Sequence, residues 1–251
     1  MHSRKCENDQ NNSEAPRREN SKHVTDQPNA LRRLLVKHVY GDHNKSKDVR
    51  NALNQLISTQ SPDFFGLNIG SGDTFFSENI KNVDITPGAN THYTASIESL
   101  PFEDNTVDLI ITQEVLEHVE NPIIAAGEIA RVLKPGGKAY IQVPFIIGYH
   151  PCPSDYWRFT HEGIEQLARQ GRLAVIARGY SVGPATGFYR IAVEFAAVLA
   201  STLYAKLYLP TKAVLCIALY PLKLLDPLLK KSPQAHRIPG GVYVICQKKN
   251  N

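Results

Sequence analysis

The chain has 251 residues, a formal net charge of +4, 42% hydrophobic residues and 21% charged residues. This length supports one sizeable core with some chain left over, and the composition is that of a globular protein rather than a fully disordered one. The charge is uneven, because residues 59–181 carry eight basic and fifteen acidic side chains, whereas residues 182–251 carry nine and two. The acidic residues 59–181 and the basic residues 182–251 therefore indicate two parts of the chain that contact different kinds of surface or ligand.

Residues 1–28 contain no Leu, Ile, Phe, Trp or Tyr and are rich in Asn, Glu, Arg and Ser. Such a segment cannot bury enough apolar surface to order itself, so we predict a disordered tail. Within residues 29–60, the stretches ALRRLLVKHVYG and VRNALNQLI place apolar residues at helical spacing. They predict one or two short helices that lead into the core.

The four cysteines lie far apart in the sequence, and none forms a Cys-x-x-Cys pair. No secretory signal is recognisable at the N-terminus, so we expect reduced thiols and a cytoplasmic location. These cysteines are Cys6, Cys152, Cys216 and Cys246.

Residues 61–181 alternate between strand-like and helix-like patterns. Between the third and fourth strand-like runs, Asn121 and Pro122 are typical of a helix start, and KPGG is typical of its end. A second helix is expected over residues 161–170. This α/β alternation predicts a mostly parallel sheet covered on both faces, with ligands beyond the carboxyl ends of its strands. The strand-like runs are FFGLNIG, IKNVDI, VDLIITQ, GKAYIQVPF and RLAVIARGY.

A glycine-containing turn, Gly70-Ser71-Gly72, follows the first predicted strand, and Asp84 ends the second. A tight glycine turn lets a ligand approach the backbone, and an acid one strand away can accept hydrogen bonds from ribose hydroxyls. The missing third glycine disfavours a pyrophosphate cofactor and favours an adenosine-type ligand without phosphates. An ordinary strand-to-helix turn is the alternative interpretation.

Five stretches extend this pattern: LNIGSGD, VDI, ESLPFEDNTVDLIITQEVLEHVENP, EIARVLKPGG and YIQVPF. In order and spacing, over roughly Phe65 to Phe145, they resemble the successive motifs of the class I S-adenosylmethionine-dependent methyltransferases, type 11 branch. The resemblance implies a Rossmann-like methyltransferase sheet with helices on both faces, an antiparallel last strand and S-adenosyl-L-methionine as cofactor. The stretch YHPCPSDYWRFTHEGIEQL further resembles a subgroup associated with bacterial cell-surface glycan synthesis.

The resemblance also implies roles for single residues. The glycine turn would wrap the methionine part of the cofactor, and Asp84 would hold the ribose hydroxyls. Ser96 and Ile97 would flank the adenine, and Gln113 and Glu114 would close the pocket. The full set of implied cofactor-binding residues is Gly70, Ser71, Gly72, Asp84, Ile85, Ser96, Ile97, Gln113 and Glu114.

Two positions depart from the family pattern. Asn68 stands where an acid usually precedes the glycine turn, and Ser96 stands where an acid often meets the adenine amino group. Both keep hydrogen-bonding capacity but remove charge. They leave open an alternative function, a catalytically inactive methyltransferase-fold scaffold that acts through its C-terminal helices.

Two histidines are the candidate catalytic groups, because His118 follows the strand-like run VDLIITQ and His150 follows the run GKAYIQVPF. Methyl transfer from a sulfonium depends mainly on alignment of the acceptor, and a base is needed only when the acceptor must lose a proton. The alternative role for His118 is to cap or orient the end of a helix.

A polar and aromatic loop, Asp155-Tyr156-Trp157-Arg158, follows His150 and is the candidate acceptor site. An aromatic face and a fixed guanidinium bind sugars or acids well. The alternative is a loop that Trp157 latches onto the core. His150, Cys152 and Asp155 make a poor zinc set, since three mixed ligands on one loop lack a fourth, so we expect no metal.

The basic end, residues 182–239, is predicted to be an apolar helical insertion before a last antiparallel strand in residues 240–251. Its stretches FAAVLASTLYA and AVLCIALYPL are uncharged but too short to span a bilayer. Apolar helices with cationic borders are typical of elements that lie on an anionic membrane surface. We therefore expect peripheral contact with the inner face of a membrane and a small-molecule, lipid-linked or glycan acceptor, with no nucleic-acid partner. A helical hairpin that packs on the core or forms a homodimer interface is the alternative.

Overall fold

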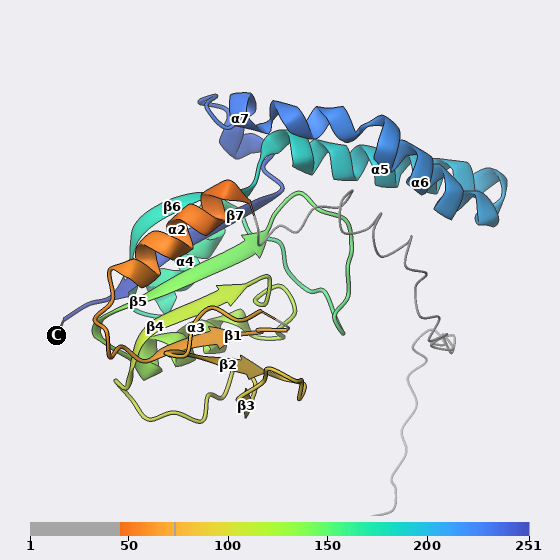
Figure 1. Cartoon of the computed structure of the whole chain (residues 1–251). Coiled ribbons are helices and arrows are strands. Elements are labelled where there is room, and N and C mark those ends of the chain that lie inside the picture. The colour runs from red at the N-terminus through yellow and green to blue at the C-terminus, as the bar shows by residue number, and fades with distance from the viewer. Residues whose placement is uncertain (1–45, 73, 251) are drawn as a thin grey trace, which may run out of the picture.

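The computed structural model describes residues 46–72 and 74–250 (Figure 1). The predicted tail and the first predicted helix, from Ala30, lie outside these residues. The second predicted helix is confirmed as α2 (Lys47–Ser58). The Ser46 side chain caps it by accepting a hydrogen bond from the Val49 N–H group at 3.3 Å.

Seven strands form one sheet in the order β3-β2-β1-β4-β5-β7-β6. All neighbouring strands from β3 to β5 are parallel, and β7 runs antiparallel to both β5 and β6. The predicted mixed sheet with an antiparallel last strand is therefore confirmed. The strands are β1 (Gly66–Ile69), β2 (Ile80–Asp84), β3 (Tyr93–Thr94), β4 (Val107–Gln113), β5 (Leu133–Pro144), β6 (Leu173–Val182) and β7 (Gly241–Lys248).

The strand order reverses direction at β1, which lies between β2 and β4. Ile69 pairs with Val83 of β2 on one side and with Thr112 of β4 on the other. The chain segments that follow these three strands consequently leave the sheet at one common edge. This reversal is the place where open α/β sheets bind ligands.

Helices cover both faces of the sheet, and both helices predicted within the core are found, α3 (Pro122–Val132) and α4 (His161–Gln170). The Asn121 side chain caps α3, as the sequence predicts. Residues of α3 and α4 pack in one core cluster with Leu67 and Ile110, whereas α2 packs on the opposite face against Leu109 and Ile111. The alternation along β4 therefore supplies both cores.

The alternation of strands and helices is incomplete at the start of the sheet. Among the described residues, no helix lies between β1 and β2 or between β2 and β4. The first connection is short, and the second contains Pro87, Gly88 and Pro101, which interrupt helical periodicity. Irregular loops therefore form this part of the common edge.

The insertion between β6 and β7 is helical, as predicted. Its two long helices run side by side and extend past the end of the sheet to which the parallel strands point (Figure 1). Tyr189, Val193 and Cys216 form a small core between them. The elements are α5 (Pro184–Leu203), η3 (Ala205–Leu207), α6 (Tyr208–Ala218), η4 (Tyr220–Leu225), α7 (Asp226–Leu229) and η5 (Ala235–Arg237).

The insertion leaves and re-enters the sheet through a narrow stem. Val182 at the end of β6 pairs with Gly241 at the start of β7, and the Gly240 N–H group donates to the Val182 carbonyl at 3.1 Å. A Cβ atom on Gly187 would lie 2.8 Å from the Gly240 nitrogen, so the two chain segments touch here. Residues 183–240 therefore enter and leave the sheet at one pair of adjacent positions.

Asp226 of α7 completes the N-terminus of α5. Its Oδ1 accepts hydrogen bonds from the N–H groups of Ala185 at 2.8 Å and Thr186 at 3.3 Å, and its Oδ2 accepts from the Thr186 hydroxyl. The residue in the capping position is Gly183, which has no side chain to do this. A carboxylate at a helix N-terminus is also favoured by the helix dipole.

We predict that Asp226→Ala lowers the free energy of unfolding by about 1–2 kcal/mol, because α5 loses its cap. The matched control is Asp48→Ala, which removes the half-exposed ion pair to Lys230 (2.6 Å) and should cost well under about 1 kcal/mol. Urea unfolding monitored by circular dichroism measures both. Equal losses in the two variants would contradict the capping role.

Candidate functional site

The glycine turn lies at the common edge, directly after β1. Gly70 (φ +67°) and Gly72 (φ +48°) both adopt left-handed backbone conformations, which glycine tolerates best. A Cβ atom on Gly70 would lie 2.2 Å from Val115 Cγ2, whereas one on Gly72 would meet nothing within 4 Å. The turn is thus packed at Gly70 and open at Gly72, where a ligand can approach the backbone.

Asp84, at the end of β2, holds this turn in place. Its Oδ2 accepts a hydrogen bond from the Gly72 N–H group at 3.0 Å, and its Oδ1 accepts from the Thr86 N–H and hydroxyl groups at 3.0 Å each. Partial burial acts to raise the pKa of Asp84, but the hydrogen bonds from Thr86 and Gly72 outweigh it and the pKa is lowered. An ionised carboxylate therefore stands at the edge beside the open side of the turn.

The other predicted cofactor residues are distributed around this edge. Ile85 is 67% exposed and follows Asp84 directly. Ser96 lies in the loop after β3, and its hydroxyl accepts from the Glu98 N–H group. Ile97 is buried in the main core, so its side chain is not at the surface.

Asn68, which replaces an acid, has an internal role. Its side-chain amide donates to Asn82 Oδ1 at 3.1 Å and to the Thr74 carbonyl at 3.4 Å. Both asparagines are buried. This pair of amides therefore fastens β1 to β2 and to the chain that follows the glycine turn.

Glu114 is the first residue after β4 and has a left-handed φ of 56°. Its Oε1 accepts a hydrogen bond from Gln142 Nε2 at 2.9 Å, and Gln113 donates to the same glutamine at 3.3 Å. Burial raises the pKa of Glu114, and the neighbouring Glu117 carboxylate raises it further. Two acidic groups therefore lie close together after β4.

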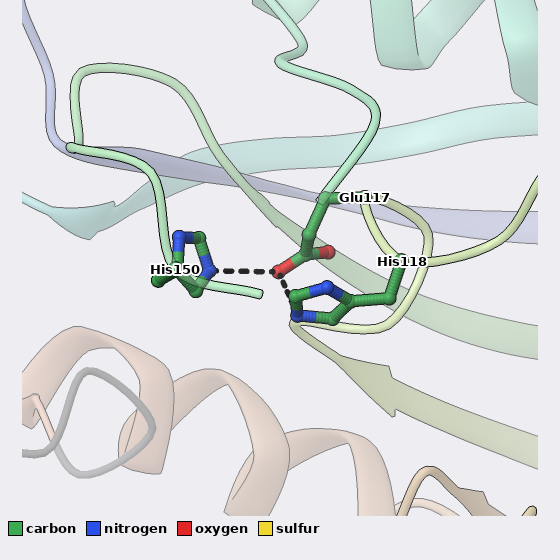
Figure 2. Close-up of side chains that lie close together, drawn as sticks. All are labelled: Glu117, His118 and His150. Atoms are coloured by element: carbon green, nitrogen blue, oxygen red, sulfur yellow. Dashed lines mark ion pairs between the residues drawn. The ribbon is translucent and has the colours of Figure 1, made fainter. Parts of the chain in front are cut away.

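Glu117 is the residue that the sequence analysis missed. It is fully buried, and neither carboxylate oxygen has a hydrogen-bond partner. His118 Nε2 lies 3.6 Å and His150 Nε2 lies 3.8 Å from Glu117 Oε1 (Figure 2). Both predicted histidines thus converge on Glu117. The only sequence signal for this residue is its place in QEVLEH, three residues after Glu114 and directly before His118.

The loop that contains Asp155, Tyr156, Trp157 and Arg158 is fastened to the segment after β4. The N–H groups of Tyr156 and Trp157 donate to the Glu117 carbonyl at 2.7 and 3.2 Å, and Trp157 Nε1 donates to the Val119 carbonyl at 2.9 Å. The latching contact proposed as the alternative role of Trp157 is therefore present. Its ring remains 42% exposed beside Tyr156, which is 49% exposed.

Asp155 and Arg158 pair with each other in the same loop. Arg158 Nη1 and Nη2 each lie 2.6 Å from one Asp155 oxygen, a two-pronged ion pair. The Arg158 guanidinium lowers the pKa of Asp155 to about 2. This pair shapes the loop, and the exposed rings of Tyr156 and Trp157 are the parts of it that face outward.

Residues 67–141 match the family model described as a methyltransferase domain. An uncharacterized methyltransferase of Schizosaccharomyces pombe is 34% identical over 84 residues, which cover 34% of this chain and 28% of that protein. An uncharacterized methyltransferase of Mycobacterium leprae is 36% identical over 64 residues, 26% of this chain and 24% of that one. The chain thus spans about a quarter of the length of these relatives.

Solved structures show the same fold. A phosphoethanolamine N-methyltransferase of Haemonchus contortus, in complex with phosphomonomethylethanolamine and S-adenosylhomocysteine, has a TM-score of 0.52 at 15% identity. The similarity covers 90% of this chain and 59% of that one. The same enzyme in complex with S-adenosyl-L-methionine has a TM-score of 0.50 at 16% identity and covers 86% and 56%. The sheet is therefore that of Rossmann-like methyltransferases.

We predict that Gly70→Ala destabilises the protein more than Gly72→Ala. Both substitutions strain a left-handed backbone by about 1–2 kcal/mol, but only the first also drives a methyl group into Val115. Thermal unfolding of the two variants measures the difference. Adding Val115→Ala should recover part of the loss for Gly70→Ala and none for Gly72→Ala.

Proposed function

We propose that the chain transfers a methyl group from S-adenosylmethionine to an acceptor bound between the loops after β4 and β5, because residues 67–141 match a methyltransferase-domain model and the sheet has the fold of methyltransferases. The observation that carries this proposal is the open side of the glycine turn beside the ionised Asp84. Bound S-adenosylmethionine supplies an electrophilic methyl group on its sulfonium. The chain's own residues supply position and charge.

The residues present fit such a cofactor. Gly72 leaves room at the backbone, and the lowered pKa keeps Asp84 ionised to accept hydrogen bonds from ribose hydroxyls. The exposed Ile85 side chain offers an apolar wall for the adenine. Glu114, which follows β4 at the same edge of the sheet, would close the pocket.

The acceptor would lie against Tyr156 and Trp157, whose rings are half-exposed and whose backbone is fixed to Glu117. A fixed aromatic face suits a flat or ring-shaped acceptor such as a sugar. The partly buried Asp155–Arg158 pair acts indirectly, by holding the loop in shape.

A second candidate, an inactive scaffold with the methyltransferase fold, is favoured by one observation. No helix follows the glycine turn among the described residues before β2, so the turn lacks the positive end of a helix dipole. If the chain does not bind the cofactor, the helices of the insertion would be the surface through which the scaffold binds its partners.

Calorimetric titration of the full chain with S-adenosylmethionine distinguishes the two candidates. We predict that the parent binds and that Asp84→Ala weakens binding tenfold or more, because one or two charge-assisted hydrogen bonds to the ribose are lost. Thr86→Ala is the matched control, since it removes one donor to Asp84 but leaves the carboxylate. A folded Asp84→Ala variant that binds like the parent would contradict the site, and a parent that does not bind would favour the scaffold.

The surface of the insertion between β6 and β7 indicates where the acceptor is located in the cell. Within the described part of the chain, no helix is long and apolar enough to cross a bilayer. Its helices nonetheless expose many large apolar side chains, including Phe195 (68%), Leu203 (85%) and Leu224 (70%). Exposed apolar surface of this extent is typical of an interaction site, and we propose contact with an anionic membrane that carries a lipid-linked or glycan acceptor.

Some basic side chains of the insertion form ion pairs within the protein and are less available to bind anionic lipid. Lys212 pairs with Glu194 at 2.7 Å and Lys230 pairs with Asp48 at 2.6 Å. Lys231 and Arg237 are exposed at the end of the insertion. These two are therefore the better residues for testing attraction to a charged surface.

We predict that the protein sediments with vesicles containing anionic lipid and that raising the salt concentration releases it. Lys231→Glu with Arg237→Glu should weaken binding, since each cation near the surface contributes about 1 kcal/mol. Arg172→Glu with Lys249→Glu is a control with the same change of charge, at the far end of β6 and β7. Salt-independent recovery in the soluble fraction, with a concentration-dependent dimer, would overturn the membrane proposal.

A further inference from the structure

Three side chains from two loops converge in the cluster of Glu117, His118 and His150 (Figure 2). One ligand atom from each lies within 4.8 Å of the other two. Glu117 is fully buried, and both of its oxygens lack a hydrogen-bond partner. A buried carboxylate without donors is costly, so a proton or a cation at Glu117 would stabilise this arrangement.

The outer nitrogens of both imidazole rings face acceptors. His118 Nδ1 lies 2.5 Å from the Ser154 carbonyl oxygen, which can only accept, so we assign the proton to Nδ1. In this neutral tautomer of His118, Nε2 carries no proton and its lone pair points toward Glu117.

The Nδ1 atom of His150 also faces mainly hydrogen-bond acceptors. Its Nδ1 faces the Gly148 carbonyl at 3.1 Å and an Asp155 oxygen at 3.4 Å, against one donor, Arg158 Nη2, at 3.3 Å. Two acceptors and one donor favour a proton on Nδ1. In the neutral form, two nitrogen lone pairs and a carboxylate therefore face one another.

The two distances from Glu117 Oε1 match those between ligands of one ion. A direct charge-assisted N–H···O bond would be about 2.7–2.9 Å long. The Nε2 atoms instead lie 3.6 and 3.8 Å from Glu117 Oε1. Two atoms that are each about 2.1 Å from a metal, at tetrahedral or wider angles, lie roughly 3.4–3.8 Å apart.

We propose that Glu117, His118 and His150 bind one divalent first-row transition-metal ion. Two imidazoles and one carboxylate suit zinc, manganese, iron or cobalt better than calcium or magnesium, which take oxygen ligands. Carbonyl groups orient both rings, as the second coordination sphere does in metal sites. Three protein ligands leave a coordination position open.

This proposal departs from the expectation of no metal, which considered only His150, Cys152 and Asp155. Cys152 is exposed and Asp155 is committed to Arg158, so neither joins His150. The missing ligands come instead from the segment after β4, as Glu117 and His118. The proposal does not depend on methyl transfer, but an ion held through Nε2 would prevent either histidine from acting as a base there.

Metal binding can be measured on the full chain without cofactor. After treatment with a chelator, the protein is titrated with cobalt(II) chloride and followed by its visible absorption, and zinc uptake is counted by mass spectrometry. We expect one ion per chain. Glu117→Gln and His150→Ala should each weaken binding by more than the 10–100-fold that loss of an outer-sphere partner costs.

The matched control is His236→Ala, which removes an exposed histidine of the insertion and should bind like the parent. Glu117→Gln also gives a readout of folding. Because it removes a buried carboxylate, it should melt at or above the temperature of the metal-free parent, and zinc should raise the melting temperature of the parent but not of this variant.

Two outcomes would overturn the proposal. One is cobalt uptake that is equal in the parent and in Glu117→Gln, which would mark adventitious binding elsewhere. The other is a parent that takes up no ion and shows a doubly protonated His118 or His150 at neutral pH by nitrogen NMR. In that case, a proton rather than a metal neutralises Glu117.

Discussion

The position of β1 between two parallel neighbours is the constraint on which the functional part of this molecule depends. Because β2 and β4 flank it in register, Gly70, Asp84 and Glu114 leave the sheet at the same edge. The hydrogen bond from Gly72 to Asp84 then closes the first two loops on each other.

Features that depend on local periodicity or on one residue's conformation could be predicted from the sequence. The β-like runs became strands, and Asn121 with Pro122 marked the start of α3. The glycine turn was predicted from residue types that tolerate a left-handed backbone, and both glycines adopt one. The two histidines were predicted to share one edge of the sheet because they follow adjacent strands, and both lie beside Glu117.

Features that depend on burial or on pairing between distant segments could not be predicted in this way. Nothing in the composition of QEVLEH distinguishes a buried Glu117 from a solvated one. Asp155 and Arg158 suggested recognition of an acceptor, but they satisfy each other. Among the described residues, the lack of helices after β1 and β2 was also not predicted, because the alternating pattern does not show that the first connection is short or that Pro87, Gly88 and Pro101 interrupt the second.

The narrow stem of the insertion has an architectural consequence. Since Val182 and Gly241 are already paired neighbours on antiparallel strands, β6 and β7 would form an ordinary hairpin if a short turn replaced everything between them. The helices from α5 to η5 are thus an appendage to a complete sheet rather than a part of it. Such an appendage can be lengthened, exchanged or lost without changing the strand order of the sheet.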